Sequence, residues 1–161
     1  MVAAEDYAWA VRSHALSTNY CLTFVRGRTP DEVVARLGGM RPISIKSGDA
    51  AFAAQQVVQH RIDEDGAAQP SRLGYVAVTQ AGEWAMVVEP NGFGCTGGEW
   101  LRALDAEVFS FFAGEYSDPQ FVWARRGEIL VSFDPGYPDE QRWGSEPNRL
   151  DATLRELGFA R

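Results

Sequence analysis

The chain has 161 residues, 45% of them hydrophobic and 12% aromatic, which suits one compact domain, residues 1–161, with a core of its own. Its formal net charge of -7 disfavours nucleic acid and anionic membrane surfaces as partners, because both need a basic face on the protein. The chain also lacks any run near the roughly 18 apolar residues of a membrane-spanning helix, so no membrane partner is predicted.

The first elements along the chain are predicted from local signals. Residues 5–15 form a predicted helix, and residues 20–26 form a predicted strand. The clearest helix start follows, with Thr29 as the cap, Pro30 in the first helical position and Glu32 completing a capping box. This helix should end at the next pair of glycines.

The middle of the chain changes from helix to strand. The alanine-rich segment 50–58 favours a helix, although it ends in β-branched residues, and residues 63–71 are predicted to be a polar loop. Residues 75–79 and 84–89 then form a predicted β-hairpin, joined by residues 80–83.

Three more strands and a helix complete the predicted fold. The strands are residues 108–112, 121–124 and 128–133, and the last two form a hairpin through a turn at Arg126 and Gly127. The closing helix is residues 147–157, with a stripe made by Leu150, Leu154 and Leu157. The sequence therefore predicts an α+β fold: a mostly antiparallel sheet of five to six strands, one face well covered, with helices near both termini.

A glycine-rich loop after the predicted strand 84–89 raises the question of ligand binding. Its glycines match the spacing of a dinucleotide-binding fingerprint, but that motif belongs to parallel βαβ units, whereas this strand is predicted to pair into a hairpin. An Asn-Gly pair also suits a plain tight turn. If the loop does bind a small molecule, the predicted ligand-binding residues are Glu89, Asn91, Gly92, Gly94 and Cys95.

The residue types that catalysis and metal binding need are scarce. Nucleophilic attack by Cys95 would need a histidine, and His14 and His60 both lie in predicted helices with no motif around them. Neither histidine has the spacing of a zinc ligand, so no metal and no cofactor are predicted. This pattern is more typical of a binding protein than of an enzyme. Most basic residues are arginines, which we interpret as a coding bias rather than as an arginine-based site.

The loop after the last predicted strand is the best candidate for contact with another protein. Segment 134–146 is acidic and holds a tryptophan beside an arginine, a pairing typical of interface hot spots. The alternative is that this tryptophan simply packs the last helix against the sheet. The predicted partner-binding residues are Tyr137, Asp139, Glu140 and Trp143.

Several segments together resemble a known family. They are Tyr7 to Trp9, Tyr20 to Val33, Trp84 to Gly92, and the closing Leu-Gly-Phe159. The chain resembles a family of small actinobacterial proteins known only as a domain of unknown function, over most of its length except residues 40–72. The resemblance implies a soluble, cytoplasmic bacterial protein, and it supplies no catalytic residues.

These observations favour a non-enzymatic protein-binding module, such as an immunity or accessory protein that turns its acidic surface toward a basic partner. The alternative is a small-molecule or nucleotide-binding enzyme that uses the loop after Glu89, and a homo-oligomeric structural subunit is a third hypothesis. Cys21 and Cys95 are too few for a disulfide framework, which predicts a cytoplasmic protein with reduced thiols.

Overall fold

The computed structural model describes residues 19–38, 76–90, 94–114 and 118–159. Within these ranges six strands form one sheet: β1 Tyr20–Arg26, β2 Ala77–Ala81, β3 Trp84–Pro90, β4 Glu107–Ala113, β5 Gln120–Arg125 and β6 Glu128–Phe133. The helices are short: α2 Pro30–Arg36, the 3-10 turn η4 Gly94–Thr96, α4 Gly98–Leu104 and α5 Asp151–Glu156.

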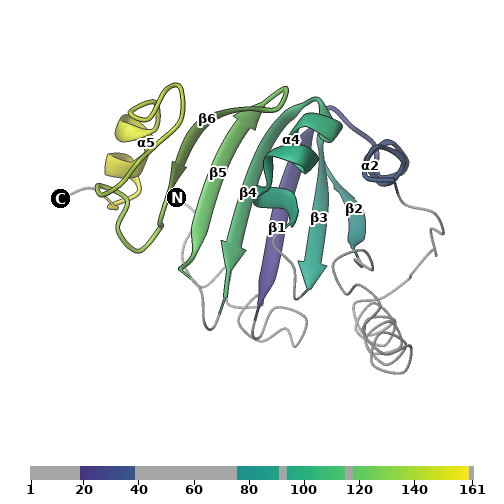
Figure 1. Cartoon of the computed structure of the whole chain (residues 1–161), viewed down its shortest axis with the longest axis horizontal. Helices are drawn as coiled ribbons and strands as arrows, with labels where there is room; N and C mark the ends of the chain where they lie inside the picture. The colour runs from purple at the N-terminus through teal and green to yellow at the C-terminus, as the bar shows by residue number, and fades with distance from the viewer. Residues whose placement is uncertain (1–18, 39–75, 91–93, 115–117, 160–161) are drawn as a thin grey trace.

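The sheet is antiparallel at every pairing, in the order β2-β3-β1-β4-β5-β6. The predicted antiparallel α+β fold is therefore confirmed. β1 lies in the middle, between β3 and β4, although it comes first among the described strands. Figure 1 shows α2 near the β2 end of the sheet and α5 beyond β6 at the other end.

One face of the sheet is covered by α2 and α4, as predicted for a well-covered face. Figure 1 shows α4 lying across this face. Val33 of α2 and Leu101 and Leu104 of α4 are fully buried in one cluster with side chains of four strands. The strand members are small or β-branched for the most part: Cys21, Val25, Ala85, Val87, Val108, Phe112, Val122 and Ala124. Burial of this apolar area is the main stabilising term of the fold.

Two hydroxyl groups lie inside this core and satisfy each other. The oxygens Oγ1 of Thr23 and Oγ of Ser110 are 2.8 Å apart, and the Sγ of Cys21 lies 3.2 Å from the same Ser110 oxygen. All three side chains are buried, so these hydrogen bonds remove the penalty of burying unpaired polar groups. Cys21 is a fully buried cysteine of the core.

The opposite face of the sheet carries an aromatic row, because strand side chains alternate between the two faces. Phe109 of β4 packs between two tryptophans, with its ring centre 5.5 Å from Trp84 and 5.3 Å from Trp123. Phe121 continues the row to Phe133, at 4.9 Å. Ring contacts at these distances stabilise a sheet beyond the area that they bury.

Most predicted element boundaries agree with the structure, and two do not. The strand 20–26 and the capping box of α2 are confirmed. β2 extends to Ala81, two residues beyond its predicted end, because the turn is tighter than the predicted residues 80–83 and has Gly82 at a positive φ of 62°. The predicted helices 5–15 and 50–58 and the loop 63–71 lie outside the described residues.

The last helix is shorter than the predicted 147–157. It starts only at Asp151, because the backbone before it forms tight turns: Arg149 N donates to Glu146 O, and Asp151 N donates to Asn148 O. The predicted leucine stripe is also only partly correct. Leu154 is buried, whereas Leu157 follows the last turn of α5 and is 66% exposed.

Candidate functional site

The loop after β6 is built from short turns that fix its shape. We call residues 134–146 the C-terminal loop. Asp134 begins it with two hydrogen bonds: its carboxylate accepts from Gly136 N at 2.8 Å, and its carbonyl accepts from Tyr137 N at 2.9 Å. Tyr137 O then accepts from Glu140 N at 2.9 Å. The side chain of Tyr137 therefore projects from a backbone that is tied down on both sides.

The second half of this loop runs along the free edge of β6. Trp143 and Ser132 exchange two backbone hydrogen bonds, of 2.8 and 2.9 Å, and Ser145 N donates to Ile129 O at 3.0 Å. Gly144 makes this approach possible, since a Cβ at its position would lie 2.3 Å from Leu130 O. The loop thus pairs with an edge strand that would otherwise be open to other chains.

Arg142 holds the loop to α5. Its side chain is only 11% exposed, and it donates to Pro138 O, to the Asp151 carboxylate and, at 2.9 Å, to the Asp139 carboxylate. Its guanidinium carbon also lies 5.9 Å from the centre of the Phe133 ring. Because this largely buried guanidinium has three acceptors, on the loop and on α5, it fixes the C-terminal loop against α5.

The large exposed apolar side chains belong to the C-terminal loop and to the end of α5. Among the described residues, the large hydrophobic side chains classed as exposed are Tyr137 at 64%, Trp143 at 49%, Leu157 and Phe159. The acidic side chains of Asp139 and Glu140 are exposed on the same loop. All four predicted partner-binding residues are thus exposed on the C-terminal loop, and their role in binding stays a prediction. Leu157 and Phe159, near the end of α5, are exposed apolar residues that the sequence did not single out.

Sequence patterns do not reveal two sets of exposed residues, Leu157 and the arginines at the strand ends, and the reasons differ. Leu157 was assigned to the buried stripe of a longer helix, and only the early end of α5 reveals its exposure. Arginines at the ends of β1 and β5 line one pocket at the strand ends, although they are far apart in the sequence. The signal that could have found them is position, because each sits at a predicted strand end or turn.

Two of the residues predicted to bind a ligand after β3, Glu89 and Gly94, make structural contacts. Glu89 is 7% exposed, and its carboxylate accepts a hydrogen bond from Gly94 N at 3.1 Å. A Cβ at Gly94 would lie 2.9 Å from the ring of Trp100, so this space is filled. Asn91 and Gly92 lie outside the described residues, as does the side chain of Cys95. Ligand binding at this loop stays a prediction.

The surroundings of β3 also differ from those of a dinucleotide-binding fingerprint. β3 is antiparallel to both of its neighbours, β1 and β2. The short helix α4 follows from Gly97, which caps it with no side-chain hydrogen bond. A fingerprint needs a parallel βαβ unit to aim a helix at the pyrophosphate, and these strands do not form one.

The helices and the potential metal-binding side chains of the described residues bear on the kind of site. None of their helices has the length and apolar character needed to cross a membrane. Within the same residues, no three His, Cys, Asp or Glu side chains are grouped so as to hold a metal ion.

Comparison with known proteins gives one match. A family model described as a family of unknown function, DUF6461, matches residues 1–161. No curated protein and no solved structure matches the chain.

Proposed function

The chain belongs to DUF6461, a family of unknown function, and on that premise we propose that it is a non-enzymatic protein-binding module of the bacterial cytoplasm. The C-terminal loop and α5 form its binding surface, and the partner is a basic protein. An immunity or accessory role fits such a module, because in both roles binding itself is the activity. Two cysteines are too few for a disulfide framework, which suits a reducing compartment.

The observation that carries the proposal is the exposure of Tyr137 and Trp143 on a backbone that is already fixed. Tyrosine and tryptophan are enriched among the residues that contribute most binding energy at protein interfaces. Their backbone is held by turns, by pairing with β6 and by the Arg142 contacts, so binding would order little more of the chain. Such preorganisation lowers the entropic penalty of association.

The charge of the loop favours a basic partner. Residues 134–146 contain four acidic residues and one arginine, a formal charge of -3 out of -7 for the whole chain. The single arginine, Arg142, already forms ion pairs with Asp139 and Asp151. Glu140 has no ion pair with any residue in the described ranges, so its charge is available to a partner. Complementary charge raises the association rate and orients the encounter.

The alternative, an enzyme that binds a small molecule or nucleotide after Glu89, has less support. The Glu89 carboxylate is hydrogen-bonded to Gly94, and the Trp100 ring fills the space beside that glycine. With these contacts made, neither the Glu89 carboxylate nor the space beside Gly94 is directed toward a ligand.

A capture experiment with matched variants tests the proposal. The full chain serves as bait in lysate of the native host, at low and at high salt. We expect a partner at low salt that is lost with Tyr137→Ala combined with Trp143→Ala, each of which should weaken binding by about 1–2 kcal/mol or more. Asp139→Asn with Glu140→Gln should slow association and remove its salt dependence.

The control removes the same number of negative charges elsewhere. Asp31 of α2 and Glu99 of α4 are exposed acidic residues outside the C-terminal loop and outside the strand that it pairs with. The double variant Asp31→Asn and Glu99→Gln should capture the partner as well as the wild type does. If both charge-removing double variants lost the partner equally, net charge alone would explain the loss, and the C-terminal loop would be ruled out as the binding surface. Self-association of the pure chain in sedimentation would instead indicate a homo-oligomer.

A further inference from the structure

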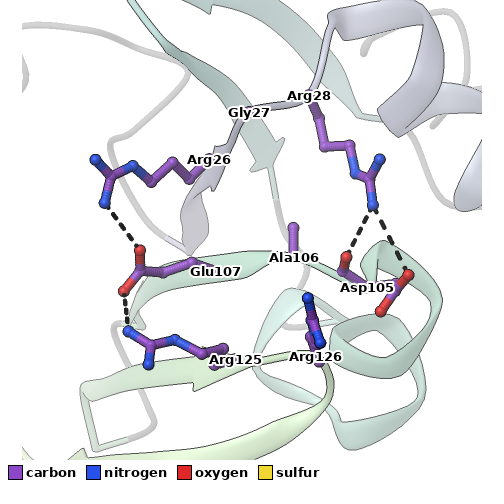
Figure 2. Close-up of a pocket in the computed structure, with 8 residues that line it drawn as sticks. All are labelled: Arg26, Gly27, Arg28, Asp105, Ala106, Glu107, Arg125 and Arg126. Atoms are coloured by element: carbon purple, nitrogen blue, oxygen red, sulfur yellow. Dashed lines mark hydrogen bonds and ion pairs between the residues drawn. The ribbon is translucent and has the colours of Figure 1, made fainter.

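An arginine-rich hollow lies at the ends of the inner strands β1, β4 and β5, where three chain turns that are distant in sequence meet. Arg26 and Arg28 flank the turn between β1 and α2, Asp105 and Glu107 belong to the junction of α4 and β4, and Arg125 leads into the turn between β5 and β6 (Figure 2). This hollow is open and has a volume of about 360 Å³. We call it the arginine pocket. Its size is near the lower end for small-molecule sites in proteins.

The arginine pocket is positive on an acidic protein. Its lining contains four arginines, Arg26, Arg28, Arg125 and Arg126, against the two carboxylates of Asp105 and Glu107, which leaves a local formal charge of +2. Outside the lining, Glu83 pairs with Arg26 at 3.1 Å, and Arg36 lies 3.9 Å from Asp105. The whole chain carries -7, so this concentration of positive charge is local.

The carboxylates of Asp105 and Glu107 both already pair with arginines. Glu107 accepts from Arg26 at 3.2 Å, from Arg125 at 3.1 Å and from the indole nitrogen of Trp123 at 3.2 Å. Arg28 Nη2 donates to the carbonyl of Asp105 at 2.8 Å and lies 3.8 Å from its carboxylate. Each acid therefore orients guanidinium groups around the cavity and leaves part of their donor capacity unused.

Two donors in the arginine pocket have no acceptor within the described part of the chain. The Nε of Arg28 is buried and has no hydrogen-bond partner. Arg126 is exposed and makes no ion pair there, and Figure 2 shows its side chain between the Glu107 pairs and Asp105. Unsatisfied buried donors are rare in native proteins, and a cavity with free guanidinium donors suits an anion.

Two non-glycine residues of the arginine pocket have positive φ angles, a backbone conformation that is unfavourable for residues with a side chain. Arg126 has a φ of 51° and Gly127 a φ of 82°, the combination found in type I′ hairpin turns. Asparagine is strongly preferred at the first position of that turn, and an arginine there is strained. Asp105 also has a positive φ, of 46°. Strained residues cluster at functional sites, where the side chain matters more than local stability does.

We propose that the arginine pocket binds a small molecule through a dianionic phosphate group. A phosphate monoester carries a charge near -2 at neutral pH and has three acceptor oxygens, which matches the local charge and the surplus of guanidinium donors. Arg126 is the residue that contacts the phosphate, and Arg28 and Arg125 flank it. This site is separate from the protein-binding surface proposed above.

Thermal unfolding of the full chain in inorganic phosphate tests the proposal. At constant ionic strength, replacing chloride by phosphate at about 100 times its Kd should raise Tm by about 5–10 °C. Arg126→Asn restores the residue that the turn prefers, so without phosphate its Tm should equal or exceed that of the wild type. Its Kd for phosphate, from titration calorimetry, should rise by at least about tenfold.

Two controls separate the site from general charge and from the proposed protein-binding surface. Arg155→Asn removes the same charge from an exposed position of α5 and should leave the phosphate response intact. Tyr137→Ala with Trp143→Ala should also leave it intact, so either proposal can fail alone. The phosphate proposal is overturned if phosphate raises Tm no more than chloride does, if Arg126→Asn keeps the full response, or if malonate stabilises the chain equally.

Discussion

Glu107 shows how one side chain can join three strands. It lies on β4, and its carboxylate accepts from Arg26 of β1 and from Trp123 and Arg125 of β5. Burial by itself would raise the pKa of Glu107, but the hydrogen bonds from Arg125, Arg26 and Trp123 outweigh burial and lower its pKa below the ordinary value. The fold therefore favours the ionised carboxylate.

A pH prediction follows for Glu107→Gln. Because the folded pKa is lowered, the carboxylate stabilises the fold fully above the ordinary glutamate pKa and loses this effect as pH falls through the lowered value. We expect the variant to lose about 1–2 kcal/mol of unfolding free energy at pH 7, with the difference shrinking below about pH 4. Urea unfolding at several pH values measures this difference. A difference that stays constant down to pH 3 would contradict it, and the exposed Glu128→Gln serves as the control.

Gly144 is a second residue whose identity the fold dictates. Its φ is 123°, and a Cβ would meet Leu130 O at 2.3 Å, whereas Gly82 has a φ of 62° with open space around it. We expect Gly82→Ala to lose about 1–2 kcal/mol from backbone strain alone, and Gly144→Ala to lose about 3 kcal/mol or more. Denaturant unfolding compares the two variants. Equal losses would mean that the close approach of the C-terminal loop to β6 does not matter to stability.

At the scale of elements, α2 has the strongest local signal in the described chain. The Thr29 side chain accepts from Glu32 N at 3.3 Å, and the Glu32 carboxylate accepts from Thr29 N at 2.8 Å. We expect Thr29→Ala to destabilise the protein by about 1 kcal/mol, since it leaves a helix donor unpaired. Thr153→Ala, at an exposed position inside α5, is the matched control and should be neutral or slightly stabilising. A loss that is equal at both threonines would argue against the capping box.

Elements were predictable where the signal is local. The capping box fixes the start of α2, and alternating apolar residues identify β4, β5 and β6 with boundaries within about one residue. The signal failed for α5, whose apolar spacing extends over residues that form tight turns. Apolar spacing tells which residues can share a face of a helix, but competing backbone hydrogen bonds decide where the helix begins.

At the scale of the whole molecule, the two candidate sites differ in how far the sequence could reveal them. The C-terminal loop is one continuous segment, so its acidic and aromatic composition was visible directly. The arginine pocket depends on β1 lying next to β4, and on β4 lying next to β5. Strand order is decided by packing of the whole sheet, and no local pattern around Arg26 or Arg126 encodes it.

The same topology predicts how the chain folds. β1 must pair with β3 and β4, so that Thr23 meets Ser110 across 87 residues, whereas β5 and β6 are joined by a two-residue turn. Long-range pairings form late because closing long loops is entropically unfavourable, and we expect folding in about milliseconds to seconds. The β5–β6 hairpin should be formed in the transition state, and β1 should pair with β3 and β4 afterwards.

Two buried valines test this order by the same chemical change. Val25 of β1 and Val131 of β6 are both fully buried, so each substitution to alanine should destabilise the protein by about 2 kcal/mol. Val131→Ala should mainly slow folding, with a φ-value of about 0.5 or higher, and Val25→Ala should mainly speed unfolding, with a φ-value of about 0.3 or lower. Stopped-flow folding and unfolding in urea measures both. A higher φ-value at Val25 than at Val131 would mean that the central strand is placed before the hairpin closes, and the order of assembly would be the reverse.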